Sequence, residues 1–204
     1  MKRNRKIENT RIVRGFTPER INAFSDGVFA IVITIMILAL KRPSSPTFGA
    51  LFAEWPTWIS YIVSYIFIAI VWINHHYLLK HATTATLRLI WANFAHLFAV
   101  SLIPFNTDWM AETRLQAVPV AMYGFVFLLV NITYILLIRE TMGTRKNTNQ
   151  PNQATRLFHI RSVLTILIFG SAMIVALWHP YIGFGIICSC LTLYLRPEVP
   201  GMEN

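Results

Sequence analysis

The chain alternates between long apolar stretches and short polar breaks, and this pattern predicts six membrane-spanning helices. A spanning helix needs about 20 mostly apolar residues, and the stretches are close to that length. Polar segments and a His-Pro hairpin separate them, as is typical of turns and loops. The fold class is therefore an all-α membrane protein. The expected helices cover residues 17–40, 51–79 (or 55–79), 86–105, 118–138, 156–178 and 181–195, with loops at 106–114 and 139–154.

The first predicted helix has two different faces. At about 100° per residue, one broad stripe is aliphatic apart from a single hydroxyl. Ser25 and Asp26 lie well over ~100° away from Ile31 on the same wheel. An ionisable group at membrane depth is costly and almost always faces protein or water. We therefore expect this helix to lie inside an assembly. The aliphatic stripe consists of Phe24, Gly27, Ile31, Thr34, Ile35 and Leu38.

Composition and charge agree with a multi-pass membrane protein. Apolar residues make up 55% of the chain and charged residues 13%, whereas ordinary globular proteins carry about 25% charged residues. A net charge of +9 could indicate nucleic-acid binding, but the basic residues lie between the apolar stretches and at the N-terminus. No nucleic-acid partner is expected. If the N-terminus lies on the cytoplasmic side of the membrane, only Lys41, Arg42 and Arg114 of the 18 Lys and Arg residues lie on the opposite side. Because Lys and Arg are enriched on the cytoplasmic side, this distribution predicts that both termini are cytoplasmic.

The chain divides into one membrane domain and two short ends. Residues 1–16 form a basic cytoplasmic segment, residues 17–196 the six-helix domain, and residues 197–204 a cytoplasmic tail. The basic start, MKRNRK, is not a signal peptide, because the apolar run after it begins too far in and is too long. Cys188 and Cys190 lack the spacing of a zinc site or disulfide framework and are expected to be small packing residues.

Polar side chains of the first three helices are expected at one depth. Asp26 lies about 10 Å from the start of its helix at 1.5 Å per residue. The next two helices run in alternating directions and bring the other polar groups to the same layer, with Trp91 nearby. Such a layer could simply hold the helices together, or it could also sense protons, because histidine titrates near neutrality. The layer comprises Ser25, Asp26, Trp72, Asn74, His75, His76, Asn93 and His96.

Metal binding and catalysis find little support in the sequence. Zinc could be considered at His75, His76 and His81, but adjacent histidines point about 100° apart on a helix, and no other ligand completes the set. No nucleophile, phosphate-binding or metalloprotease motif is present. We expect no metal, no cofactor and no enzyme activity.

The residues of the first helix resemble a known family. Arg20, Phe24, Ser25 and Asp26 form an R-x-x-x-F-S-D pattern that runs on into G-V-F-A-I and Thr34. This pattern is similar to the signature of the transmembrane-protein-175 family of potassium channels. The W-x-N-H of Trp72, Asn74 and His75 also matches. The resemblance extends over the whole chain as one six-helix unit of the bacterial type, which implies a location in the bacterial inner membrane among its lipids.

The resemblance implies a pore and its lining. In the family the first helix lines the conduction path, so Ile31 takes the constricting position, Thr34 the hydroxyl ring that supports selectivity, and Ile35 and Leu38 further aliphatic positions. Arg20 joins the polar interhelical network. One-repeat members are tetramers, which implies a homotetramer with K⁺ in the pore. No T-V-G-Y-G filter is implied, and none occurs. From its spacing alone, an aliphatic stripe of this kind is more typical of core.

Two other functions stay open. A proton-coupled secondary transporter could use Asp26 and the histidines as its relay, but broken helices and a midplane acid would be typical of it. Only Pro104 and Pro119 interrupt the later helices, and Asp26 lies off the midplane. A non-conducting assembly protein would need only the packing network.

Overall fold

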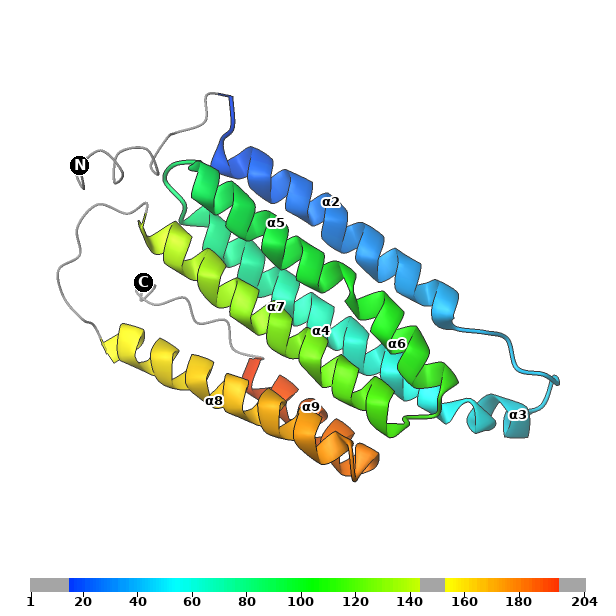
Figure 1. The fold of residues 1–204 in the computed structure, drawn as a ribbon. Helices are drawn as coiled ribbons and strands as arrows, with labels where there is room; N and C mark the ends of the chain where they lie inside the picture. Colours follow the sequence, from blue (N-terminus) through cyan, green and yellow to red (C-terminus); the bar gives the residue numbers. More distant parts are fainter. Residues whose placement is uncertain (1–14, 144–152, 195–204) are drawn as a thin grey trace.

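The computed structural model describes residues 15–143 and 153–194, and all regular secondary structure within these ranges is helical. The predicted all-α class is confirmed. The predicted tail and most of the predicted basic N-terminal segment lie outside the described residues. Long helices lie side by side along the bundle, with a helical hairpin along one side (Figure 1). The elements are α2 (Pro18–Met36), the 3₁₀ helix η1 (Ile37–Ala39), α3 (Phe48–Ala53), α4 (Trp55–Lys80), α5 (Leu87–Ser101), α6 (Ile103–Glu112), α7 (Ala117–Gly143), α8 (Gln153–Ala176) and α9 (Pro180–Tyr194).

Four stretches are long and apolar enough to cross a membrane. They are residues 18–39, 55–80, 87–112 and 117–143. The last two predicted spans correspond to shorter apolar segments, Val163–Ala176 and Pro180–Leu191. The chain is therefore a multi-pass helical protein with at least four candidate spans within the described residues.

The expected loop at residues 106–114 is wrong, because α6 occupies most of it. The helix before it ends at Ser101, close to Pro104, which has no N–H to donate to the preceding turn. The chain then continues as α6 to Glu112. Asn106 and Thr107 look like loop residues, but their side chains donate hydrogen bonds to the carbonyls four residues earlier, of Leu102 and Ile103.

The other differences lie at element boundaries. The predicted loop at 139–154 begins too early, because α7 continues to Gly143. The short α3 was not expected; the Thr47 hydroxyl caps its first turn by accepting a hydrogen bond from the Ala50 amide. The predicted hairpin at His179 and Pro180 is confirmed between α8 and α9.

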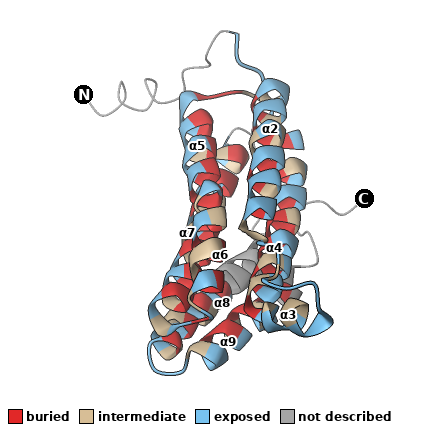
Figure 2. Cartoon of the chain, turned by 90° about the vertical axis from the view of Figure 1, so that its right-hand side faces the viewer, coloured by how far each residue is buried: buried red, intermediate tan, exposed pale blue. Residues whose placement is uncertain are grey.

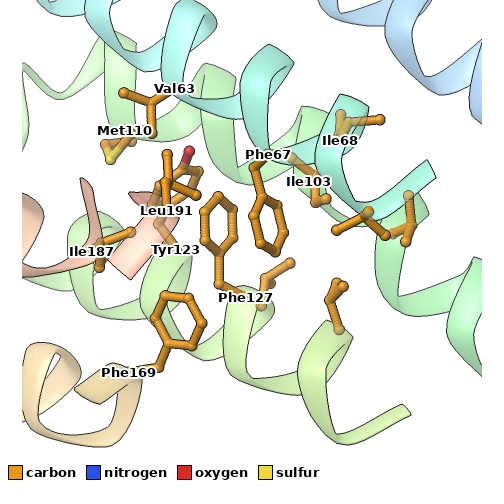
Figure 3. Packing of buried hydrophobic residues seen from close by; sticks show 14 of the residues in the cluster. Val63, Phe67, Ile68, Ile103, Met110, Tyr123, Phe127, Phe169, Ile187 and Leu191 are labelled. Atoms are coloured by element: carbon orange, nitrogen blue, oxygen red, sulfur yellow. The ribbon is translucent and has the colours of Figure 1, made fainter. Parts of the chain in front are cut away.

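The main core includes buried residues of α2, α4, α5, α6, α7 and the α8–α9 hairpin. Phe67 of α4 stacks on Phe127 of α7 with ring centroids 3.6 Å apart, and Phe169 of α8 meets Phe127 edge-on (Figure 3). Between helices that span a membrane, close van der Waals packing of this kind stabilises the contact. At its far side Gly183 of α9 packs so closely on α8 that an added Cβ would lie 2.6 Å from the Cβ of Ala176.

The helix α2 covers the opposite side of the bundle. It packs on α4, α5 and α6 through one narrow face whose side chains are buried: Ile21, Ser25, Phe29, Val32 and Met36. Exposed residues follow the rest of its length (Figure 2). The Thr17 hydroxyl caps the first turn, followed by Pro18, which is favourable at the first helical position.

Candidate functional site

The aliphatic stripe predicted on the first helix is exposed along its whole length. Ile31 is 59% exposed, Ile35 48% and Leu38 76%. Thr34 and Gly27 are exposed between them, and a Cβ added at Gly27 would meet nothing within 4 Å. Within one chain, then, this stripe is not core. An exposed apolar face of this length marks a surface that another molecule covers.

The Thr34 hydroxyl is oriented by a hydrogen bond within its own helix. Its hydroxyl donates a hydrogen bond of 2.9 Å to the carbonyl oxygen of Ile31 in the preceding turn. The hydroxyl proton is therefore directed at the helix, and the oxygen lone pairs remain for another donor or a cation. The side chain is exposed in the middle of the aliphatic stripe.

The C-terminal part of the stripe borders a groove. The groove has a volume of about 640 Å³ and separates α2 from the α5–α6 corner. Ile31, Ile35 and Leu38 form one wall, and Ser101 and Phe105 lie on the other. The aliphatic positions thus lie toward the α5–α6 side of the exposed face, whereas Thr34 lies outside the groove lining.

Beyond this end, charged side chains tie the chain after α2 to α6. Lys41 forms an ion pair with Glu112. The pKa of Lys41 is raised, first by this hydrogen bond and the charge of Glu112, and then by the negative charges of Asp108 and Glu54. Both partners of the pair are more than half exposed, and exposed pairs contribute little to stability.

The predicted polar layer exists, and the structure divides it into two parts. The first part is buried and joins α2, α5 and α4. The Asn93 amide donates to the Ser25 hydroxyl at 3.0 Å, and its oxygen lies 2.7 Å from Nε2 of His75. Because an amide oxygen only accepts, His75 must donate through Nε2. All three side chains are buried.

This buried part continues to α7. The rings of His75 and His96 are nearly parallel, with an interplanar angle of 6° and centroids 5.7 Å apart. Nδ1 of His96 lies 3.1 Å from the hydroxyl of Thr133, which itself donates to the Leu129 carbonyl. Thr133 was not expected in the layer, because a threonine within an apolar helix gives no sequence signal of its partner. Asn74 takes part through its backbone, since its carbonyl accepts a hydrogen bond from Tyr134.

The second part surrounds Asp26 and is half-exposed. One carboxylate oxygen of Asp26 accepts a hydrogen bond of 2.8 Å from the indole of Trp72, and the other accepts one of 3.2 Å from Asn22. His76 lies 3.9 Å from the carboxylate, and its Nδ1 is 3.1 Å from the Asn22 amide. Asn22, four residues before Asp26, was missed, although this spacing places both on one helix face.

Two predicted neighbours of the layer point outward instead. The Arg20 side chain is exposed, and its backbone amide donates to the Thr17 hydroxyl. Trp91 is 67% exposed on α5. His81 lies at the end of α4, where Nδ1 is 2.8 Å from the Tyr77 carbonyl. Over residues 15–143 and 153–194, no group of three His, Cys, Asp or Glu side chains is arranged to hold a metal ion.

A second buried polar cluster was not predicted. The Ser64 hydroxyl of α4 lies 2.7 Å from both the Thr107 hydroxyl of α6 and the Tyr123 hydroxyl of α7. All three residues are buried. The cluster joins three helices near the break between α5 and α6, and so fixes the segment that borders the groove.

Comparison with known proteins gives the family. Residues 20–104 match the model of the family described as endosomal/lysosomal potassium channel TMEM175. A protein from Chryseobacterium named a potassium channel is 31% identical over 182 residues, which cover 89% of this chain and 94% of the relative. The chain belongs to the TMEM175 family. The resemblance carried by the Arg20–Asp26 pattern is confirmed.

Two further comparisons agree with this assignment. A Streptomyces collinus protein named a potassium channel is 34% identical over 123 residues, which cover 56% of this chain and 60% of that relative. The crystal structure of a lysosomal potassium-selective channel TMEM175 homolog from Chamaesiphon minutus superposes with a TM-score of 0.76. It is 22% identical, and the match covers 87% of this chain and 95% of that one. At this identity the structural match shows a shared fold. The TMEM175 family is a channel family and not a class of enzymes.

Proposed function

We propose that this TMEM175 protein forms a potassium-selective channel in which the α2 helices of four symmetric copies surround a central pore. The observation that carries the proposal is the exposed face of α2, which is apolar, as long as the helix, and interrupted by Thr34. One chain has a single α2 and cannot enclose a pore, so rotational symmetry must supply the other copies. The relatives named potassium channels support K⁺ as the permeant ion.

The proposed pore has two kinds of layer. Four Ile31 side chains form a hydrophobic constriction, with Ile35 and Leu38 as further aliphatic positions, and a dry constriction of this kind stops ions until it widens. Four Thr34 oxygens then replace part of the hydration shell of K⁺. Complete removal of water is too costly, ideally ~20 kcal/mol for an ion moved into a dry medium. The ion therefore stays partly hydrated.

The proposed arrangement in the membrane uses all six hydrophobic segments. The 26 residues of α4 extend about 39 Å at 1.5 Å per residue, more than a hydrocarbon core of about 30 Å. The α8–α9 hairpin supplies the last two spans. Both termini then lie in the cytoplasm of a bacterial cell, because most Lys and Arg residues fall on that side.

Reconstitution into planar bilayers tests this function. With KCl on one side and NaCl on the other, a channel gives stepwise currents that reverse toward the K⁺ equilibrium potential. Slow current without steps that requires a pH gradient would instead indicate a proton-coupled transporter. Intact oligomers that carry neither current would contradict the proposal and leave an assembly protein. Bilayers without protein serve as the control.

A further inference from the structure

The exposed face of α2 has two chemically different flanks, and both lie at one depth. On a helical wheel Asp26 and Phe24 lie about 80° to either side of Thr34. On one flank Asp26 contacts Trp72 of α4. On the other flank Phe24 contacts Phe94 of α5, with ring centroids 5.5 Å apart.

The flank on the α4 side is polar and incompletely covered. The side chain of Asp26 is 37% exposed and that of His76 29%. Trp72 beside them is 39% exposed. The Asp26 carboxylate accepts two hydrogen bonds and has capacity for more. An ionisable pair at membrane depth does not face lipid. Protein or pore water must therefore cover this polar flank, which consists of Asn22, Asp26, Trp72 and His76.

The flank on the α5 side is aromatic and protrudes. Trp91 is 67% exposed, Phe98 62% and Phe94 45%. These side chains recur at helical spacing along one side of α5. The indole N–H of Trp91 has no hydrogen-bond partner among the side chains that the structure describes, so it remains available as a donor. Tryptophan with a free N–H is typical of protein interfaces.

The contacts of α2 place the two flanks at the same level. Ser25, the neighbour of both Phe24 and Asp26, is bonded directly to Asn93 of α5. Trp91 lies about half a turn from Asn93 along that helix. Rotation about a pore axis does not change depth, and a ring of identical copies needs two different complementary surfaces on each copy.

We infer that Trp91, Phe94 and Phe98 of one copy cover the Asp26–Trp72–His76 flank of the next copy around the pore. This inference rests on the proposed function, because it needs copies arranged around α2. It makes the family's Asp26 pattern part of a junction between subunits as well as of a network within one. Trp91 is its central residue, with an aromatic surface to exclude water and an N–H directed toward the carboxylate.

Photo-cross-linking tests this junction directly. The photoreactive amino acid p-benzoylphenylalanine replaces Trp91, and two forms of the chain with tags of different size are expressed together. Irradiation should give covalent products that contain both tags, with the link mapped by mass spectrometry to residues 72–77 of the partner chain. The matched control carries the probe at Phe125, which is 41% exposed on α7, a helix that belongs to neither flank, and should give none.

Other outcomes would overturn the inference. Links from position 91 to lipid alone, to α5 of the partner chain, or to no other chain would mean that lipid, a symmetric contact or pore water covers the polar flank. If the probe at position 91 prevents folding, the same experiment with the probe at Phe98 tests the junction instead. The currents of the unirradiated protein keep the two proposals apart: K⁺ currents without the cross-link reject the junction alone, and the cross-link without currents rejects the channel alone.

A substitution gives a second measure. Trp91→Ala should lower the fraction of oligomer on gel filtration at least about tenfold, as removal of a central aromatic anchor does. Phe125→Ala should leave that fraction unchanged. Equal behaviour of the two variants would contradict the assignment of Trp91.

Discussion

The indole of Trp72 donates a hydrogen bond of 2.8 Å to the carboxylate of Asp26, so a half-exposed polar contact joins α2 directly to α4. The buried histidines belong to a separate chain of contacts through Asn93. The two parts of the layer can therefore be tested independently. Substitutions in the buried part should affect folding, and substitutions around Asp26 should also affect assembly.

Asn93→Ala should destabilise the single chain. The change removes the acceptor of the His75 N–H and leaves that donor buried without a partner, which costs about 1–3 kcal/mol. Thermal unfolding in detergent measures the loss. Ser101→Ala is the control, because that hydroxyl is exposed and bonds only to its own helix at the Phe98 carbonyl. Equal stability of Asn93→Ala and the wild type would mean that the buried chain contributes nothing.

Ser64→Ala should cost more stability than Tyr123→Phe. The serine hydroxyl contacts both other members of its cluster, so its loss leaves the buried Tyr123 hydroxyl unpaired, at about 1–3 kcal/mol. Tyr123→Phe removes one hydroxyl and leaves Ser64 its contact with Thr107, at about 1 kcal/mol. The double variant should lose less stability than the sum of the two single losses, because both substitutions disrupt the same cluster. A double-mutant cycle measures the difference. Simple addition would indicate that the hydroxyls act separately.

The faces of α2 could be predicted from the sequence, because helical periodicity alone separates them. The spacing of Ile31, Thr34 and Leu38 places them on one side, and all three are exposed. Asp26 on another side needed partners, and the alternation of helix direction was enough to place Trp72 and His76 at its depth. Which histidine it meets depends on how the helices are rotated, and periodicity does not give that.

The region around α6 could not be predicted in the same way. Asn106 and Thr107 have the composition of a loop, yet the side chain of each donates to the backbone carbonyl four residues earlier, which is compatible with a helix. The contact of Thr107 with Ser64 joins residues 43 positions apart. Such pairs depend on the packing of whole helices, which a single sequence does not show.

Thr34→Val should reduce the preference for K⁺ over Na⁺. Valine keeps the shape of threonine but removes the oxygen that, in the proposed channel, faces the pore beside its bond to the Ile31 carbonyl. If the lost coordination has the scale of a hydrogen bond, about 1 kcal/mol, the preference should fall by about fivefold. Reversal potentials in mixed K⁺ and Na⁺ measure it. Thr34→Ser keeps the oxygen and should behave as the wild type; an unchanged potential in Thr34→Val would assign selectivity to another position.

The central claim is that the exposed face of α2 lines the pore, and a pair of neighbouring substitutions separates its two sides. Ile31 is 59% exposed, whereas Ile33 lies about 200° further round and packs partly buried against the main core. Ile31→Asn places amides that bind water in a ring that isoleucine keeps dry. The same change at Ile33 introduces an amide into the packing against the bundle.

K⁺ flux from liposomes is the most direct measurement, made at equal amounts of incorporated protein. Ile31→Asn should raise the flux and make the closed channel leak, while Ile33→Asn should lower the yield of folded protein without raising the flux per molecule. A leak through Ile33→Asn together with wild-type flux through Ile31→Asn would contradict the account, because the pore would then lie on the other side of α2.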